Sequence, residues 1–200
     1  PLMINGVLYT TAGTRRAVVA LDAATGELLW MYRLEEGERG ETAPRRLSGR
    51  GLTYWDDGDA GVILYVTPGY QLVALNAGTG LPVAAFGSSG IVDLKQNIDQ
   101  NLEPTSEIGL HAAPIVAGNT IVIGAAHRPG GAPPSRENVK GYIRGFDLRT
   151  GDRQWIFHTT PTADEFGNDS WQNGSWRYTG NSGVWAQMSI DPELNMAYFP

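Results

Sequence analysis

A seven-residue pattern that occurs three times constrains the fold of this 200-residue chain more than any other feature of its sequence. The copies align without gaps and share a small residue, an apolar residue, Asp or Asn, and a final Thr-Gly pair; they are Ala20–Gly26, Ala74–Gly80 and Gly145–Gly151. An Asp or Asn side chain can accept hydrogen bonds from the backbone amides of a turn, and a closing glycine tolerates positive φ. The pattern therefore predicts one hairpin used three times.

An aromatic residue follows each copy of the pattern. Trp30 and Trp155 lie four residues after the first and third copies, whereas the middle copy continues to Phe86. We expect each tryptophan to return on the next strand and to pack between neighbouring sheets. A single Asp-x-x-Thr-Gly segment is a common hairpin turn, but three copies favour a true repeat. Successive copies are 54 and 71 residues apart, which predicts four-stranded units of a β-propeller or a similar array.

Short runs rich in Val, Ile, Tyr and Thr, bounded by Gly, Pro, Asn or Asp, predict strands along the whole chain. They cover residues 6–11, 17–22, 61–66, 71–76, 114–116, 120–125, 142–147, 154–158, 184–190 and 196–199. Asn5-Gly6 and Gly118-Asn119 each have the spacing of a two-residue hairpin turn, and a longer turn joins Ile190 to Met196. No stretch of eleven residues has helical periodicity, so the sequence predicts an all-β fold without a long amphipathic helix.

Composition excludes several classes of protein. The hydrophobic fraction of 42% is enough for a real core, although the chain also has 26 glycines and 12 prolines. A net charge of −6 argues against a nucleic-acid partner. The chain has no cysteine, which excludes disulfides, a thiolate nucleophile and cysteine-ligated metal sites. Because it begins with Pro and lacks a signal segment, we interpret it as a piece of a longer protein.

The repeat with its tryptophan resembles the tryptophan-docking motif of pyrroloquinoline quinone (PQQ) dehydrogenases, which are eight-bladed β-propellers. Further segments that resemble this family are Arg50–Trp55, Leu72–Gly80, Val92–Leu94, Ile143–Asp147 and Glu165–Trp185. The resemblance implies one partial propeller domain over residues 1–200, with about three and a half blades and incomplete at both ends. The alcohol and methanol branches have a vicinal cysteine pair that is absent here. The chain is thus more similar to the branch of membrane-associated quinoprotein glucose dehydrogenase.

The same resemblance implies two cofactor-binding residues. Arg50 matches the family arginine that grips a PQQ carboxylate with paired charge-assisted hydrogen bonds. Without the resemblance it reads as a surface arginine in a glycine-rich loop. Trp185, six residues before Asp191-Pro192, matches the tryptophan that forms the floor under the cofactor ring. The alternative role for Trp185 is packing between blades, but Trp185 follows no Thr-Gly turn and so does not occupy the docking position.

Four further residues are weaker candidates by resemblance. Ala113 occupies the place of a family Ser or Thr that bonds a PQQ carboxylate, and it lacks that hydroxyl. His127 is expected at the cofactor edge. Glu137 and Asn138 are candidate ligands of a calcium or magnesium ion, although their spacing departs from the family pattern and a solvated loop is the alternative. We expect His111 and His158 to be structural histidines with satisfied hydrogen bonds.

The function implied by the resemblance is PQQ-dependent and calcium-dependent oxidation of a sugar (aldose) or alcohol, with electrons passed to a membrane quinone or a cytochrome. Such enzymes are expected in the periplasm, either free or attached to the membrane through a segment outside this chain. We expect the polar, aromatic segment 159–184 at the entrance for cofactor and substrate. No residue of 1–200 is predicted to be catalytic, because the family's general base lies in later blades. The alternative is a non-catalytic propeller with the same repeats that acts as a scaffold or a sensor.

Overall fold

The computed structural model describes residues 1–14, 16–47, 51–128 and 137–200, which form three four-stranded sheets and one hairpin. The first sheet contains β1 (Leu2–Ile4), β2 (Val7–Ala12), β3 (Ala17–Asp22) and β4 (Leu28–Tyr32). The second contains β5 (Thr53–Trp55), β6 (Val62–Val66), β7 (Gln71–Asn76) and β8 (Ile91–Asp93). The third contains β9 (Ile115–Ala117), β10 (Thr120–Ile123), β11 (Ile143–Asp147) and β12 (Arg153–Phe157). The hairpin pairs β13 (Ser189–Asp191) with β14 (Met196–Tyr198).

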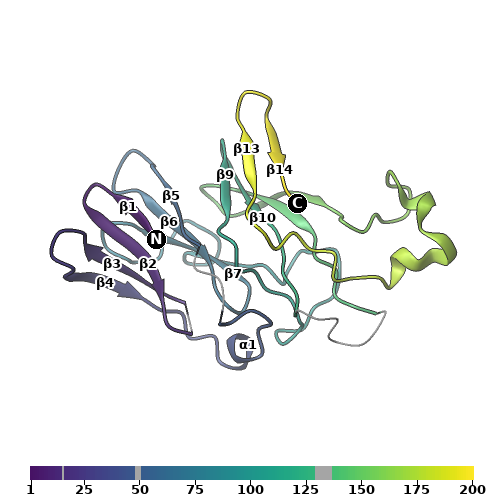
Figure 1. The fold of residues 1–200 in the computed structure, drawn as a ribbon, viewed down its shortest axis with the longest axis horizontal. Coiled ribbons are helices and arrows are strands. Elements are labelled where there is room, and N and C mark those ends of the chain that lie inside the picture. The colour runs from purple at the N-terminus through teal and green to yellow at the C-terminus, as the bar shows by residue number, and fades with distance from the viewer. Residues whose placement is uncertain (15, 48–50, 129–136) are drawn as a thin grey trace.

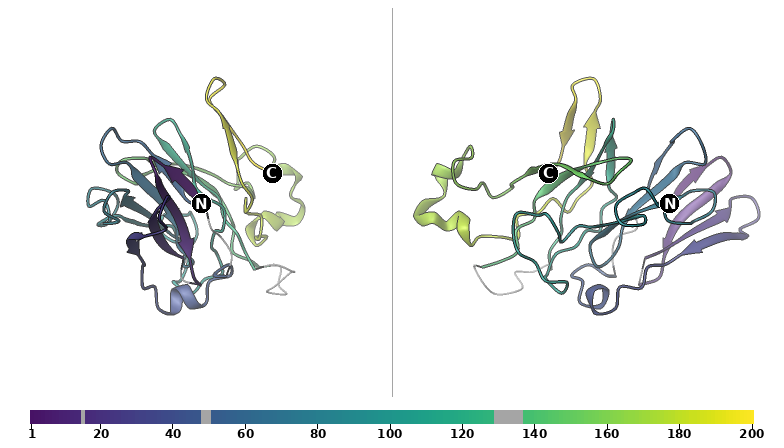
Figure 2. Two further views of the ribbon diagram at one scale, coloured as in Figure 1. Left: turned by 60° about the vertical axis from the view of Figure 1, so that its left-hand side comes forward. Right: turned by 180° about the vertical axis from the view of Figure 1, so that it is seen from behind.

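Strand order within every sheet follows chain order, and all neighbouring strands are antiparallel. The sheets lie side by side in the order of the sequence and spread like the blades of a fan (Figures 1 and 2). This arrangement confirms the predicted all-β, partial β-propeller fold. A single short helix, α1 (Glu38–Glu41), lies in the connection from the first sheet to the second. No helix in the described part of the chain has the length and apolar character needed to cross a membrane.

The repeated turn has the predicted geometry in all three copies. In each copy, Oδ1 of Asp or Asn accepts a hydrogen bond of 2.7 to 2.9 Å from the threonine amide; the pairs are Asp22–Thr25, Asn76–Thr79 and Asp147–Thr150. The closing glycines Gly26, Gly80 and Gly151 have φ of 72° to 76°, a conformation that residues with a Cβ rarely adopt. The seven-residue pattern thus encodes one turn between the third and fourth strands of each complete blade.

Trp30 docks the first sheet onto the second. Its Nε1 donates a hydrogen bond of 2.9 Å to the carbonyl oxygen of Ala77, in the turn of the second sheet. A Cβ atom on Gly80 would come within 2.5 Å of the indole, so the ring lies directly on this glycine. The predicted packing of a tryptophan between neighbouring sheets is confirmed at this interface.

Phe86 occupies the equivalent place between the second and third sheets. A Cβ on Gly151 would lie 3.2 Å from its ring, and the amide of Gly87 donates a 2.8 Å hydrogen bond to the carbonyl of Thr150. The middle copy of the repeat therefore keeps the docking contact with a smaller aromatic ring. Trp155 is partly exposed and lines a cavity of about 430 Å³ between the third sheet and the β13–β14 hairpin.

A buried cation also joins the second and third sheets. Arg144 on β11 is fully buried, and its guanidinium donates to the carbonyl of Leu94 at 2.7 Å and to the carbonyl of Gln96 at 3.2 Å. It also lies 3.3 Å from the hydroxyl of Tyr70, which donates to the carbonyl of Gly124 at 2.8 Å. Backbone carbonyls thus solvate this charge inside the interface, which fixes the connection after β8 against the third sheet.

The predicted strand over 184–190 is wrong for residues 184–188, because only Ser189–Asp191 forms β13. The carbonyl of Val184 instead accepts a 3.0 Å hydrogen bond from the amide of Ala125, at the end of the third sheet. This contact holds the segment across the sheet end, away from the hairpin ladder. Trp30 was expected on a strand, which is β4, and the Asn5-Gly6 turn implied a strand before it, which is β1. The short strands β5 and β8 were not predicted. They lie at the edges of their sheets, where pairing with one neighbour defines a strand whose own periodicity is weak.

Two glycines at equivalent turn positions test the docking contact. Gly26→Ala should lower the free energy of unfolding by about 1 kcal/mol, because alanine is strained at the positive φ of this position. No steric cost is added, since no atom lies within 4 Å of the new Cβ. Gly80→Ala has the same backbone cost and also forces the methyl into Trp30, which should add about 1–3 kcal/mol. Urea unfolding of the full-length protein measures both losses. Equal losses would contradict the docking role of Trp30.

The asparagine of the middle turn suggests a matched test of pH dependence. Hydrogen bonds from the amides of Thr150 and Arg149 lower the pKa of Asp147. Its carboxylate therefore contributes stability that is present above the unfolded pKa of about 4 and is lost as pH falls through the folded pKa. Asp147→Asn should accept the same bonds at every pH, as Asn76 does. The free energy of unfolding of Asp147→Asn near pH 7, measured by thermal unfolding, should differ from that of the wild type by less than about 1 kcal/mol. Between neutral and acidic pH, this free energy should fall less in Asp147→Asn than in the wild type. An unchanged acid profile would argue against this contribution.

Candidate functional site

The connections between the sheets meet at one end of the strands and form the candidate site. They are residues 33–47 and 51–52 between the first two sheets, 94–114 between the second and third, and 158–188 before β13. The first connection contacts the second at Gly51 and Ala113, and the third contacts the second at Trp185 and His111. Residues far apart in the sequence are thereby brought together at the junction of three blades.

Ala113 packs directly on the first connection. A Cβ on Gly51 would come within 2.4 Å of the Ala113 amide nitrogen, so only glycine allows the two backbones to approach this closely. The hydroxyl of Thr53 donates a hydrogen bond to the carbonyl of Pro114, which fixes the same two segments. Arg50, the residue before Gly51, lies outside the described residues. The side chain of Ala113 offers no hydrogen bond at this point.

Trp185 is held at the site by the residue before it. The Val184 carbonyl accepts from the Ala125 amide at 3.0 Å, and a Cβ on Gly124 would lie 2.2 Å from this same carbonyl oxygen. The Trp185 side chain nevertheless remains 56% exposed, and its ring lies beside that of His111, with centroids 5.7 Å apart and planes tilted by 33°. The indole therefore presents open apolar surface and, unlike Trp30, is not enclosed between two sheets.

His127 is buried next to the same segment. Its Nδ1 lies 3.2 Å from the carbonyl oxygen of Glu107, while Nε2 is buried and has no hydrogen-bond partner among the described residues. Gly141 and Gly183 cover this nitrogen so closely that a Cβ on Gly141 would come within 2.6 Å of it. Burial lowers the pKa of His127, so the ring is neutral at neutral pH. The structure thus places His127 beneath the segment that leads to Trp185.

The two histidines that we expected to be structural differ. His158 is fully engaged, since Nδ1 lies 2.7 Å from Glu165 Oε1, Nε2 lies 3.2 Å from Asp99 Oδ2, and its ring packs edge-on against Tyr142. The hydrogen bond with His158 is the main cause that lowers the pKa of Glu165. His111 departs from the expectation, because its buried Nδ1 has no partner in the described part of the chain. Its position two residues before Ala113 was the one sequence signal that could have pointed to the site.

The long segment 159–184 starts at the site and projects away from the sheets (Figures 1 and 2). It contains two short 3-10 helices, η1 (Asn168–Ser170) and η2 (Gln172–Arg177). The hydroxyl of Thr159 donates to the carbonyl of Gly141 at 3.0 Å, and the amino group of Lys140 donates to the carbonyl of Trp176. These contacts give the segment an ordered path, as its aromatic content suggested.

Glu137 and Asn138 lie beside this segment. The Asn138 amide donates to the carbonyl of Tyr178 at 3.2 Å, and the Asn138 carbonyl packs against Gly180. No cluster of three or more His, Asp or Glu side chains within the described ranges could hold a metal ion. A metal ion bound by Glu137 and Asn138 would therefore need ligands beyond these two.

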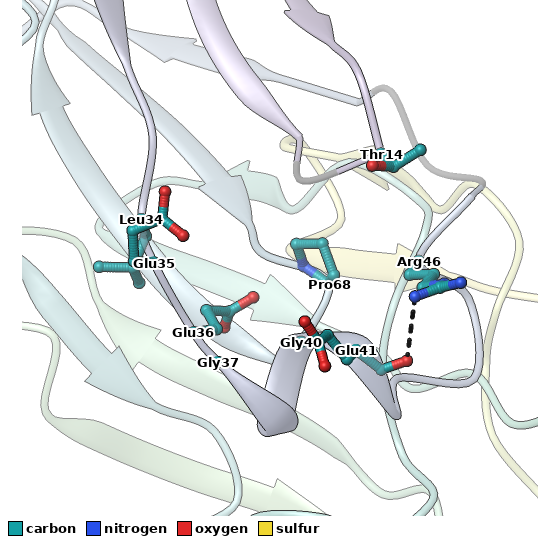
Figure 3. Close-up of a pocket in the computed structure, with 9 residues that line it drawn as sticks. All are labelled: Thr14, Leu34, Glu35, Glu36, Gly37, Gly40, Glu41, Arg46 and Pro68. Atoms are coloured by element: carbon teal, nitrogen blue, oxygen red, sulfur yellow. Dashed lines mark hydrogen bonds between the residues drawn. The ribbon is translucent and has the colours of Figure 1, made fainter.

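A separate pocket of about 200 Å³ lies around α1, in the first connection (Figure 3). Its lining includes Glu35, Glu36, Glu41 and Arg46, and Arg46 donates a 3.4 Å hydrogen bond to the carbonyl of Glu41. Glu36 is already used, because it accepts hydrogen bonds from Thr67, Gly69 and Gln71 in the turn between β6 and β7; the distances are 2.6, 2.9 and 2.8 Å. Of the expected cofactor and metal residues that the structure describes, none lines this pocket.

Comparison with known proteins shows a family match over residues 1–200, to the family described as PQQ: Glucose/ethanol/alcohol dehydrogenase, beta-propeller domain. The quinohemoprotein alcohol dehydrogenase ADH IIB of Pseudomonas putida is 30% identical over 99% of this chain and 27% of its own length. The quinoprotein glucose dehydrogenase of Escherichia coli strain K12 is 28% identical over 100% of this chain and 25% of its own length. The chain thus spans about a quarter of the length of these relatives.

The solved structures agree with the fold. The quinohemoprotein alcohol dehydrogenase ADHIIG from Pseudomonas putida HK5 matches with a TM-score of 0.74 at 27% identity, over 100% of this chain and 27% of that structure. The quinohemoprotein alcohol dehydrogenase from Comamonas testosteroni matches with a TM-score of 0.72 at 24% identity, over 100% of this chain and 28% of that one. At this lower identity, the second likeness supports the fold alone.

The anchor of Trp185 can be tested through Gly124. Gly124→Ala should displace the Val184 carbonyl and lower the free energy of unfolding by about 1–3 kcal/mol. The displacement should also change the fluorescence emission of the exposed Trp185. Gly78→Ala is the matched control, because its Cβ would have only ordinary contacts at 3.5 Å and beyond and should change stability by less than about 0.5 kcal/mol. Equal behaviour of the two variants in the full-length protein would show that Gly124 does not position Trp185.

Proposed function

This chain belongs to the PQQ-dependent glucose, ethanol and alcohol dehydrogenase β-propeller family, and we propose that the full-length protein oxidises a CH–OH group with PQQ as cofactor. Residues 1–200 supply part of the cofactor site in this proposal. The observation that supports it most is Trp185, an exposed indole at the junction of three blades and outside the docking position. A propeller that served only as a scaffold would have no need of an open aromatic face there.

The residues at the junction fit a flat o-quinone that bears three carboxylates. Trp185 offers a large apolar face for stacking. Arg50, which lies outside the described residues, is proposed from the sequence alone as a guanidinium that would pair with a carboxylate. His111 Nδ1 is a buried polar atom without a partner among the described residues, whereas Gly141 and Gly183 cover the unpaired Nε2 of His127. Such atoms are rare in folded proteins and commonly mark sites of function or of missing ligand contacts. Ala113 contributes backbone only, because it has no side-chain donor.

When bound, PQQ supplies the two-electron acceptor for the oxidation of the substrate. This chain would hold and orient that group, with Trp185 stacking on its ring and Arg50 pairing with one of its carboxylates. The buried, neutral His127 supports the segment before Trp185 from below. The general base that removes the substrate proton belongs, in this proposal, to the part of the protein outside residues 1–200.

The finer assignment extends the proposal to an aldose substrate, a calcium or magnesium ion, and a membrane quinone or cytochrome as electron acceptor in the periplasm. The 28% identity with the Escherichia coli quinoprotein glucose dehydrogenase and the absence of cysteine from this chain support the sugar. Glu137 and Asn138 are proposed as two of the metal ligands, with others from the rest of the protein. Alcohol dehydrogenases match at similar identity, so alcohols are the competing substrates.

The test uses full-length protein prepared without PQQ. Addition of PQQ with Ca²⁺ or Mg²⁺ should produce oxidation of aldoses that reduces an artificial electron-accepting dye, with primary alcohols assayed in parallel. Trp185→Ala should weaken PQQ binding by about 10-fold or more, because a buried aromatic stack is lost, whereas Trp185→Phe should retain part of it. Arg50→Ala should weaken binding by about 10-fold or more through loss of a paired charge-assisted contact.

Two outcomes would decide against the proposal. Full-length protein that neither binds PQQ nor oxidises any alcohol or sugar would favour the non-catalytic propeller. Oxidation that persists unchanged in Trp185→Ala and Arg50→Ala would show that these residues do not form the cofactor site. Faster oxidation of alcohols than of aldoses would overturn only the assignment of a sugar substrate, and the assignment as a PQQ-dependent dehydrogenase would stand.

A further inference from the structure

His111 is the one aromatic side chain that contacts the ring of Trp185 in the described part of the chain. The ring centroids are 5.7 Å apart with planes tilted by 33°, within the range in which aromatic pairs attract each other. Trp185 is otherwise 56% exposed, so few contacts set the rotation of its side chain. His111 is therefore the ring contact from which the orientation of the indole can be set.

The backbone that presents His111 is tied firmly to other blades. The carbonyl of Leu110, the residue before it, accepts a 2.6 Å hydrogen bond from the buried guanidinium of Arg16. Gly109 and Ala126 exchange two backbone hydrogen bonds of 2.9 and 2.6 Å. The imidazole thus projects from a fixed support, and side chains whose own support is rigid position their neighbours most accurately.

The imidazole gains nothing from its own hydrogen bonding at Nδ1. This atom is buried and lacks a partner within the described residues, which is a cost of about 1–3 kcal/mol for a polar group. The contribution of His111 to this site therefore comes from its flat ring and not from a hydrogen bond of Nδ1. Burial, together with the cations Arg45 and Arg16, lowers the pKa of His111 and keeps the ring neutral. A neutral ring leaves the electron density of the indole available to an electron-poor ring stacked on it.

We propose that His111 is a positioning residue for the cofactor, which sets the plane of Trp185 on which the quinone stacks. This inference rests on the proposed function and adds a residue to its site. His111 acts through the indole by ring contact and touches neither the substrate nor the reacting atoms. A flat ring at position 111 is sufficient for this role, whereas a small side chain leaves Trp185 free to rotate.

The experiment compares His111→Ala and His111→Phe in full-length protein titrated with PQQ in the presence of Ca²⁺. His111→Ala should raise the dissociation constant by about 3- to 10-fold and alter the induced circular dichroism of the bound PQQ absorption band, since that signal depends on the angle between quinone and indole. His111→Phe should restore the dissociation constant to within about 2-fold of wild type and recover the dichroism. Arg149→Ala is the control, because it removes a side chain lying 5.4 Å from another tryptophan ring, that of Trp55, and should change neither readout.

Each result bears on the inference. A dissociation constant and dichroism unchanged in His111→Ala would overturn it and leave the proposed function intact. Failure of His111→Phe to restore binding would also overturn it, because the role would then need a nitrogen atom. Wild-type protein that does not bind PQQ would overturn the proposed function and this inference together. If His111→Ala does not fold, as judged by far-ultraviolet circular dichroism, His111→Asn against His111→Phe provides the same contrast of small and flat side chains.

Discussion

The contact between an aromatic ring on one blade and a glycine turn on the next is the constraint on which the rest of this structure depends. The turn needs a side-chain acceptor at its start and a glycine with positive φ at its end, as in Asn76–Gly80. The same glycine lacks the Cβ that would collide with Trp30. Glycine thus allows the positive φ of the turn in its own blade and the close approach of the aromatic ring from the neighbouring blade. The contact fixes the position of each sheet relative to the next.

That relative position brings the connections between blades together, which is why a site can form from segments so distant in sequence. Phe86 and the buried Arg144 hold the second sheet against the third, and the neighbouring connections bring Gly51 to Ala113 and His111 to Trp185. The cation is solvated by carbonyls, so it ties irregular connections to a regular sheet. Blade docking supplies the stability, and the junction above it is left free to present exposed or unpartnered groups such as Trp185.

Much of the fold was predictable from local sequence, and the site much less so. Turn chemistry at Gly118-Asn119 and at the three Thr-Gly turns is written in adjacent residues, so it was predicted correctly. The strand over 184–188 was predicted wrongly, because apolar residues there serve a contact to Ala125 in another blade. The sequence predicts a satisfied structural histidine at position 111, which is wrong because the missing partner of Nδ1 and the contact with Trp185 arise only from three-dimensional packing.

The repeated turn, the all-β class and the family can be recognised without coordinates, because each depends on residues a few positions apart or on a motif that spans the chain. The packing of Phe86 on Gly151, the places of His127 and His111, and the exposure of Trp185 follow only from the arrangement of the sheets in space. Those features arise where connections that are distant in the sequence come into contact. The number of residues between two connections does not predict whether they come into contact. The physical reason is that local turns are fixed by backbone chemistry, whereas the junction is fixed by the angles between whole sheets.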